Sequence, residues 1–143
     1  MARNAMRPTG ALAVPQSLLT FPIHLGLGGT ATAQPSFDGM EWYAAYAERA
    51  AADGCDGWLV SLYRFDENWD SWEMHPVGHE VVLCIEGTMT LHQQLAAGDE
   101  RRVTLGPGDY AINPPGAWHT ADVEEQVTAL FITAGEGTTH RPR

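Results

Sequence analysis

Carboxylate and imidazole side chains are concentrated in one short stretch of the sequence, residues 72–87. Glu73 and His75 precede a turn, and Glu80 follows it at the start of an apolar run. Because side chains alternate between the two faces of a strand, Glu73 and His75 point to the same side. If the segments on either side of the turn lie next to each other, all three side chains converge. Carboxylate oxygens and imidazole nitrogens bind zinc, iron and manganese, so this stretch predicts a metal site.

A second stretch, residues 108–119, supplies a further imidazole. Gly108 leads into a predicted strand, and a Pro-Pro-Gly turn at residues 114–116 reverses the chain tightly. His119 follows the turn and faces back beside the preceding strand. This spacing therefore predicts a strand-turn-strand unit that brings His119 toward the interior.

Length and composition limit the classes of protein. The chain of 143 residues is long enough for one domain with a buried core, and 44% of its residues are hydrophobic. Its formal charge is −10, and all eight basic residues are arginine, so we expect neither nucleic acid nor an anionic membrane as a partner. Cys55 and Cys84 do not make a disulfide framework, and no apolar run reaches about 18 residues. We therefore expect a cytoplasmic protein without a membrane span.

The N-terminal part predicts an arm and a single helix. Residues 1–19 contain Pro and Gly, which discourage regular structure, and residues 18–27 predict an edge strand. Residues 28–36 are small and predict a loop. Residues 38–52 are rich in Ala and predict a helix, whose aromatic side chains recur at helical spacing. We expect this helix to cover one face or mouth of the structure that follows.

From residue 57 onward the hydrophobic pattern changes to period two. Turn residues such as Gly-Pro-Gly at 106–108 separate short alternating segments. The predicted strands are residues 58–65, 71–75, 79–85, 88–94, 101–105, 109–113, 117–122 and 127–133. About eight short strands at regular spacing predict an all-β sandwich or jelly roll. Residues 135–143 have no periodicity and predict a solvated tail.

The first stretch resembles the first conserved motif of the cupin superfamily: His, one residue, His, three or four residues, Glu, six residues, Gly. His75, Glu80 and Gly87 match the last three of these positions. Glu73 stands where the family has its first metal-binding His. The resemblance implies His75 and Glu80 as metal ligands, with Glu73 as a replacement for the missing imidazole.

The second stretch resembles the second cupin motif: Gly, five residues, Pro, one residue, Gly, two residues, His, three residues, Asn. Gly108, Pro114, Gly116 and His119 match its first four positions in register. Val123 stands at the Asn position, which is structural in the family. The resemblance implies that His119 is a further ligand and that the cofactor is one divalent transition metal ion, namely iron, manganese, nickel or zinc.

The resemblance also implies an architecture. A cupin jelly-roll barrel would occupy residues 57–134, with the N-terminal arm and helix of residues 1–56 packed on it and a tail at 135–143, all in one domain. The arm and the outer sheet suit a homodimer in which a partner covers an edge strand.

Side chains next to the predicted ligands are candidates for a substrate pocket. Trp72 and Trp118 flank ligand positions and would form an apolar wall for a small organic molecule. Val82 and Cys84 share a strand face with the predicted ligand on their strand. The alternative is that all four are core residues. His79 is an extra ligand candidate, although strand alternation points it away from the site.

The predicted site is compatible with two main classes of function. In the first, the protein is a metal-dependent enzyme acting on a small organic molecule, and the resemblance permits oxygenase, isomerase or lyase chemistry, with Glu73 or Glu80 transferring a proton. In the second, it is a non-catalytic module that binds or senses a small molecule without metal. There His75 and His119 are polar contacts of the pocket. A purely structural protein with a vestigial pocket is a third hypothesis, and the fold does not choose among them.

Overall fold

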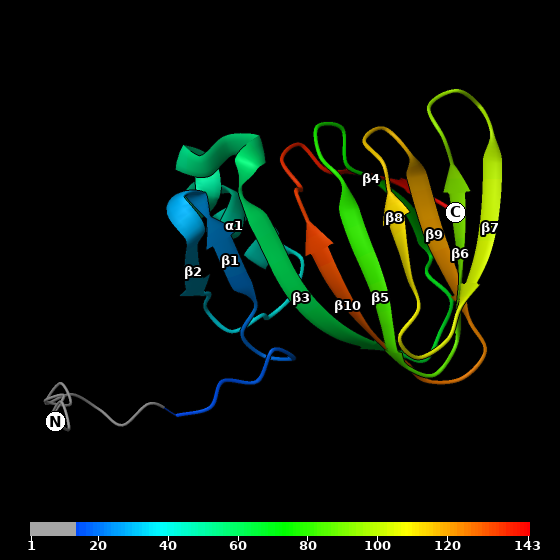
Figure 1. Cartoon of the computed structure of the whole chain (residues 1–143), viewed down its shortest axis with the longest axis horizontal. Helices are drawn as coiled ribbons and strands as arrows, with labels where there is room; N and C mark the ends of the chain where they lie inside the picture. The colour runs from blue at the N-terminus through cyan, green and yellow to red at the C-terminus, as the bar shows by residue number, and fades with distance from the viewer. Residues whose placement is uncertain (1–13) are drawn as a thin grey trace, which may run out of the picture.

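The computed structural model describes residues 14–143, so most of the predicted arm lies outside the described range. The described chain forms two antiparallel sheets that face each other, with one α-helix beside them (Figure 1). The predicted all-β jelly roll with a single helix is therefore confirmed. The longest helix has ten residues, and no helix of the described range is long and apolar enough to cross a bilayer.

The first sheet has six strands in the order β2-β1-β3-β10-β5-β8, and all neighbours are antiparallel. These strands are β1 (Ile23–Gly26), β2 (Thr30–Ala33), β3 (Trp58–Phe65), β5 (Glu80–Glu86), β8 (Tyr110–Asn113) and β10 (Val127–Thr133). Every strand pair except β1-β2 joins segments that are not consecutive strands of the chain. The sheet can therefore form only when distant parts of the chain come together.

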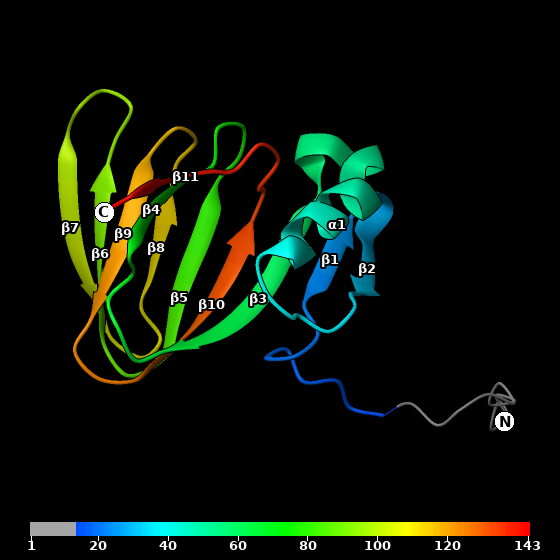
Figure 2. The same ribbon diagram turned by 180° about the vertical axis from the view of Figure 1, so that it is seen from behind.

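The second sheet has five strands in the order β11-β4-β9-β6-β7 (Figure 2). They are β4 (Ser71–Met74), β6 (Met89–Gln94), β7 (Glu100–Leu105), β9 (Trp118–Val123) and β11 (Thr139–Pro142). The chain crosses repeatedly between the sheets, for example from β4 to β5 and from β9 to β10. Each crossing brings residues near the end of one strand close to the start of a strand in the facing sheet.

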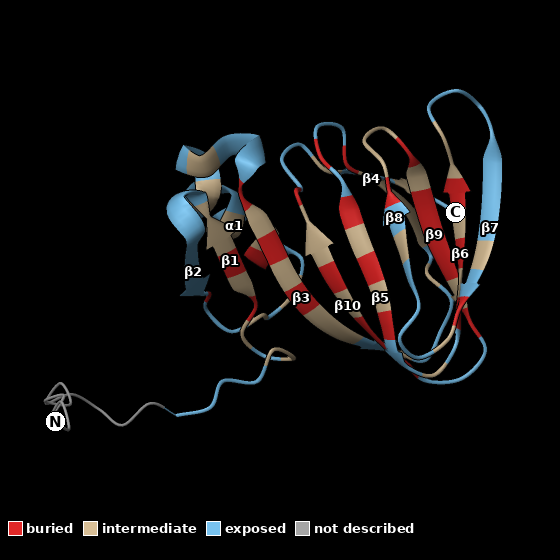
Figure 3. Cartoon of the chain, viewed as in Figure 1, coloured by how far each residue is buried: buried red, intermediate tan, exposed pale blue. Residues whose placement is uncertain are grey.

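Alternating side chains of both sheets fill the interior. Val82 and Cys84 on β5, Leu91 on β6 and Ala121 on β9 are completely buried and belong to one hydrophobic cluster. Figure 3 shows the resulting bands, in which buried residues alternate with less buried ones along β3, β10 and β5. Each fully buried aliphatic side chain contributes about 1.5–3 kcal/mol, so this cluster is the main source of stability.

The N-terminal segment forms more regular structure than expected. β1 begins directly after Pro22. A short 3₁₀ turn, η1 (Leu27–Gly29), connects it to β2, with which it pairs. The prediction of a loop at residues 28–36 was therefore wrong for Thr30–Ala33. Small residues with little hydrophobic periodicity gave no strand pattern there, and pairing with β1 decides the conformation.

Helix α1 (Glu41–Ala50) is shorter than the predicted 38–52 and continues as a 3₁₀ segment, η2 (Ala51–Asp56). It lies on the inner side of β1 and β3, beside the second sheet (Figure 2). Tyr46 Oη is 2.7 Å from His24 Nδ1, and Tyr43 Oη is 2.5 Å from Tyr63 Oη on β3. The helix therefore covers the part of the first sheet that the second sheet leaves open.

The C-terminal segment is a strand, not the solvated tail that its lack of periodicity predicted. β11 pairs with β4, placing His140 opposite Glu73 and Arg141 opposite Trp72. The Arg141 guanidinium also bonds to the side-chain oxygen of Gln94 on β6. These contacts lie far apart in sequence, which explains why local composition missed them. The last residues of the chain are thus part of the second sheet.

Candidate metal centre

Four titratable side chains, Glu73, His75, Glu80 and His119, meet between the two sheets. Each offers one ligand atom, and these atoms all lie within 4.8 Å of one another. Glu73 on β4 is directly opposite His119 on β9, and Glu80 begins β5 in the facing sheet. His75, Glu80 and His119 are buried. The structure thus brings together the four residues that the sequence proposed as ligands.

The turn between β4 and β5 is held in place by a close backbone approach. A Cβ on Gly78 would overlap the backbone of Ala134, which follows β10. Ala134 also donates its backbone N–H to the carbonyl of His79 (3.1 Å). Only glycine fits at this contact, and the contact sets the turn that places His75 beside Glu80.

Acceptors beside Nδ1 of each imidazole decide which nitrogen faces the cluster. Thr138 donates its hydroxyl proton to the carbonyl of Gly135 (2.7 Å), so its oxygen accepts from His75 Nδ1 (2.7 Å). His119 Nδ1 lies 3.3 Å from the carbonyl of Ala117, which only accepts. When neutral, both rings therefore carry hydrogen on Nδ1. Each then presents the lone pair of Nε2 to the cluster.

Glu80 is the most firmly held carboxylate of the cluster. Its Oε1 accepts from Asn113 Nδ2 (3.0 Å), and its Oε2 accepts from the Thr133 hydroxyl (2.6 Å). The same two oxygens lie 3.2 Å from His119 Nε2 and 3.1 Å from His75 Nε2. Carboxylate lone pairs facing imidazole lone pairs repel each other, so the arrangement requires a cation or protons between them.

Glu73 is more loosely held and more accessible. Its Oε2 lies 3.7 Å from His119 Nε2, and its Oε1 lies 3.9 Å from His75 Nε2 and 3.5 Å from His140 Nε2. The Glu73 side chain is 26% exposed and that of His140 43%, whereas the other three side chains of the cluster are at most 4% exposed. Solvent therefore reaches the cluster past Glu73 and His140.

The pKa shifts of Glu80 and His119 show that the carboxylates of the cluster favour positive charge beside them. Burial raises the pKa of Glu80, but the imidazoles of His119 and His75 outweigh it and hold that pKa far below its usual range. Burial lowers the pKa of His119, but the carboxylates of Glu73 and Glu80 raise it to about 9. Among the described residues, His119 Nε2 is buried without a hydrogen-bond partner. Protons on the imidazoles or a divalent cation would each supply the missing charge.

The two tryptophans expected to form a pocket wall lie elsewhere. Trp72 and Trp118 are on the outer face of the second sheet, because Glu73 and His119 take the inward positions of the same strands. The Arg141 guanidinium lies 4.3 Å from the ring centre of Trp118 and 5.4 Å from that of Trp72. The expected wall beside the cluster is therefore not formed by these residues.

The structure also shows where the remaining candidates for the pocket and the metal site lie. Val82 follows Glu80 on the inward face of β5, and Cys84 lies one step further from the cluster, deep in the core. Burial raises the pKa of the Cys84 thiol, which suits a structural residue. His79 is exposed, in agreement with strand alternation. Neither Cys84 nor His79 belongs to the group of potential ligands.

Aromatic side chains that the sequence did not single out lie on the inner side of the first sheet. The rings of Trp69 and His119 are 6.3 Å apart, and Phe131 contacts both Trp69 and Tyr63 at about 6 Å between ring centres. Burial raises the pKa of Tyr43, and the neighbouring Tyr63 and the charges of Glu73 and Glu80 raise it further. We call Tyr43, Tyr63, Trp69 and Phe131 the aromatic wall.

Several polar residues around the ligands were also missed. They are Gln93, Asn113, Thr133, Thr138 and His140. Asn113 and Thr133 could have been predicted to lie near the site, because each is a polar residue at an inward position of a predicted strand. Thr138 lies just before β11 and His140 lies within it, but this segment was too short to predict a strand.

A family model described as a cupin domain matches residues 62–140, which is more than half of the chain. A search of curated proteins found no match. Among solved structures, an uncharacterised conserved protein with a double-stranded β-helix domain from Klebsiella pneumoniae has 22% identity and a TM-score of 0.50. The match covers 60% of this chain and 76% of that one.

Two further solved structures are similar to a lesser degree. A cupin-2 domain containing protein from Shewanella frigidimarina has 21% identity, a TM-score of 0.45 and coverage of 60% and 71% of the two chains. Hydroquinone 1,2-dioxygenase from Sphingomonas sp. TTNP3 has 19% identity, a TM-score of 0.45 and coverage of 53% and 59%. Identities this low concern the fold and not the activity. The family match over residues 62–140 and the two sheets that carry it show that the chain belongs to the cupin domain family.

Proposed function

We propose that this cupin binds one divalent transition metal ion through Glu73, His75, Glu80 and His119 and acts with it on a small organic molecule. One observation carries the proposal: the Nε2 atoms of His75 and His119 both face the oxygens of Glu80, at 3.1 and 3.2 Å. Two imidazole nitrogens and two carboxylates form a donor set that iron, manganese, nickel and zinc accept. When bound, such an ion acts as a Lewis acid that polarises an oxygen of a ligand.

The two carboxylates would have different roles. Glu80 is fixed by Asn113 and Thr133, so it suits a permanent ligand. Glu73 is partly exposed and faces imidazole nitrogens at 3.5–3.9 Å, so its carboxylate has room to exchange a proton with a bound molecule. We therefore assign proton transfer to Glu73 in addition to metal binding, whereas Glu80 acts only as a ligand.

The surroundings of the cluster indicate what kind of molecule fits. A ligand entering past Glu73 and His140 would meet the aromatic wall, in which the Trp69 ring lies 6.3 Å from that of His119 and Tyr43 bonds to Tyr63. Apolar rings with two phenol groups favour a small organic molecule that has an apolar body and an oxygen function for the metal.

A metal-free binding module is the second candidate, and the charges of the cluster favour it. With His75 and His119 both protonated, two imidazolium groups neutralise the two carboxylates, and Glu80 has two further donors in Asn113 and Thr133. The cluster is then internally satisfied without metal. In that case the four residues would be polar contacts for an organic ligand.

Metal content separates the two candidates. We expect near-stoichiometric iron, manganese, nickel or zinc by plasma mass spectrometry in protein purified without an affinity tag, and its loss in the double variant Glu80→Ala/His119→Ala. His92→Ala is the matched control, because His92 bonds to Asp122 outside the cluster (2.7 Å). Metal-free wild-type protein that also fails to take up added metal would refute the metal-dependent function and favour the binding module.

A second prediction concerns the residue that orients His75. Thr138→Val keeps a similar shape but removes the acceptor for His75 Nδ1. Because such outer contacts fix the ring and its tautomer, we expect affinity for Zn²⁺ to fall about 10–100-fold in calorimetric titration. Thr139→Val, at the exposed neighbouring residue, should leave affinity unchanged. Equal affinity of Thr138→Val and wild type would exclude a positioning role for Thr138.

A further inference from the structure

Three of the four potential ligands are shut off from solvent. The side chains of His75, Glu80 and His119 are 3%, 4% and 0% exposed, whereas that of Glu73 is 26% exposed. A metal ion or an organic molecule can therefore reach the three buried side chains only if part of the structure moves. The side of Glu73, where solvent meets the cluster, is where such a movement opens the shortest path.

Residues 135–143 close this side of the cluster, and we call them the strap. Thr138 Oγ1 lies 2.7 Å from His75 Nδ1, and His140 Nε2 lies 3.5 Å from Glu73 Oε1. The strap contains β11, which is the edge strand of the second sheet and pairs only with β4 (Figure 2). Three of the four residues of β11 are exposed, but none of β4 or β9 is. Detaching β11 breaks one strand pair and leaves all the others in place.

The segment in front of β11 has the features of a hinge. Ala134 is buried, donates its N–H to the carbonyl of His79 and lies against Gly78, so it is fixed. Gly135 and Gly137 follow and are exposed, and Gly137 has a φ of +75°, which favours glycine. A fixed residue followed by two exposed glycines allows the strap to change direction as one unit.

The far part of the strap is held by side-chain contacts at the surface. Arg141 lies 4.3 Å and 5.4 Å from the ring centres of Trp118 and Trp72 on the outer face. Arg143 Nη2 lies 2.6 Å from Asp122 Oδ1, and these two side chains are 29% and 32% exposed. Contacts between partly exposed charged groups are individually weak. They can therefore break and form again without disturbing the core.

We propose that the strap is a gate. It swings away from β4 about Gly135 and Gly137, admits a metal ion or an organic molecule, and closes again over the cluster. Closing returns Thr138 to His75 and His140 to Glu73, so the closed gate completes the surroundings of the site. The opening itself is independent of the metal, and only its role in metal uptake rests on the proposed function.

A reversible cross-link tests the proposal. Thr139 on β11 is directly opposite Met74 on β4, and both side chains point away from the cluster because Glu73 and His140 take the inward positions. Thr139→Cys/Met74→Cys ties the strap to β4 by a disulfide when oxidised and frees it when reduced. Cys55→Ser in the same protein removes the exposed cysteine.

We expect a chelator to remove Zn²⁺ from the oxidised form at least about tenfold more slowly than from the reduced form, because release requires the strap to open. Reduction should restore the wild-type rate. The matched control is Thr139→Cys with Cys55→Ser, in which oxidation should leave the rate unchanged. Equal rates for the oxidised and reduced double-cysteine protein would overturn the proposal, since access would then not need the strap.

Arg141→Ala loosens the strap without a cross-link. It removes the contacts with Trp72 and Trp118, so we expect the strap to open about fivefold more often and Zn²⁺ to leave about fivefold faster. Uptake should accelerate by the same factor, which leaves the affinity nearly unchanged. A variant with a lower affinity and an unchanged uptake rate would contradict a gate, because the strap would then only support the ligands.

Hydrogen exchange in the metal-free protein tests the gate without the metal. We expect the amides of β11 that pair with β4 to exchange at least about tenfold faster than those of β9, and to slow down when the cross-link is oxidised. Exchange in β11 as slow as in β9 would overturn the proposal. A protein that binds no Zn²⁺ but shows the expected exchange would refute the metal site and still support the gate.

Discussion

Replacing Glu80 with Gln is expected to lower the affinity of the protein for a divalent metal at least about 100-fold while preserving the fold. Gln has the same shape, but it brings a neutral amide where the carboxylate faces His75 Nε2 and His119 Nε2. The amide nitrogen can donate to one of these lone pairs, but it then replaces an oxygen that accepts from Asn113 or Thr133 in the wild type. Affinity is measured by calorimetric titration with Zn²⁺ or Mn²⁺, and folding by thermal denaturation.

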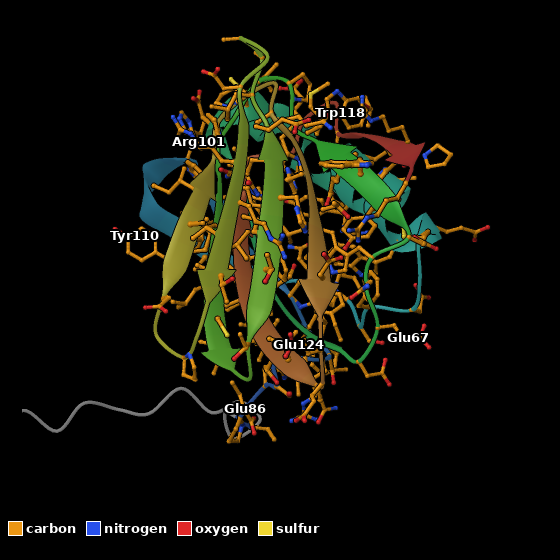
Figure 4. All side chains as sticks on the ribbon, turned by 90° about the vertical axis from the view of Figure 1, so that its right-hand side faces the viewer. Glu67, Glu86, Arg101, Tyr110, Trp118 and Glu124 are labelled. Carbon is orange, nitrogen blue, oxygen red and sulfur yellow. The ribbon has the colours of Figure 1, made fainter. Side chains whose placement is uncertain are left out.

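Glu124→Gln is the control for the charge change in this experiment, because Glu124 is exposed beyond the end of β9 (Figure 4). It should bind metal like the wild type. If Glu80→Gln bound metal with unchanged affinity, Glu80 would not be a ligand. The metal would then have to bind through other residues. Asn113 and Thr133 would no longer have a role in positioning a ligand.

Removal of residues 136–143 is expected to weaken both metal binding and stability. The deletion removes Thr138 beside His75 and His140 beside Glu73, so we expect metal affinity to fall by at least about 10–100-fold. It also removes β11 and the contact of Arg141 with the two tryptophans. Together these contacts stabilise the fold by about 2–4 kcal/mol, measured by denaturant unfolding.

Arg141→Ala separates the two effects of the deletion. It removes the stacking on Trp72 and Trp118 on the outer face but keeps Thr138 and His140. We expect a loss of stability of about 1 kcal/mol with little change in metal affinity. A deletion variant with wild-type affinity would show that β11 does not contribute to the site. A deletion variant as stable as the wild type would show that β11 is not docked in solution.

The sequence was sufficient for the architecture and for the four residues of the cluster. Period-two alternation from residue 57 onward reports which side chains face the core, and turn residues mark where strands end. The spacing of His75, Glu80 and His119 carries the cupin resemblance, and Glu73 was predicted from its place at the first His position of the first motif. These features depend on local patterns, which a sequence displays directly.

The parts that sequence reasoning missed depend on contacts between distant segments. Thr138 bonds to His75 across 63 residues, and it lies between a glycine-rich turn and β11. Trp72 and Trp118 were expected beside the ligands because they are adjacent in sequence, but adjacency on a strand means opposite faces. The aromatic wall was hidden because Tyr43 belongs to a helix and Tyr63 to a strand of the N-terminal half.

Anomalous X-ray diffraction at the absorption edge of the metal found in the purified protein tests the central claim most directly. We predict one strong peak between the sheets, about 2.0–2.3 Å from Nε2 of His75 and of His119 and from an oxygen of Glu80. A structure of metal-loaded protein with no peak there would contradict the account. A peak only at another His-carboxylate pair, such as His92 and Asp122 on the surface, would contradict it equally.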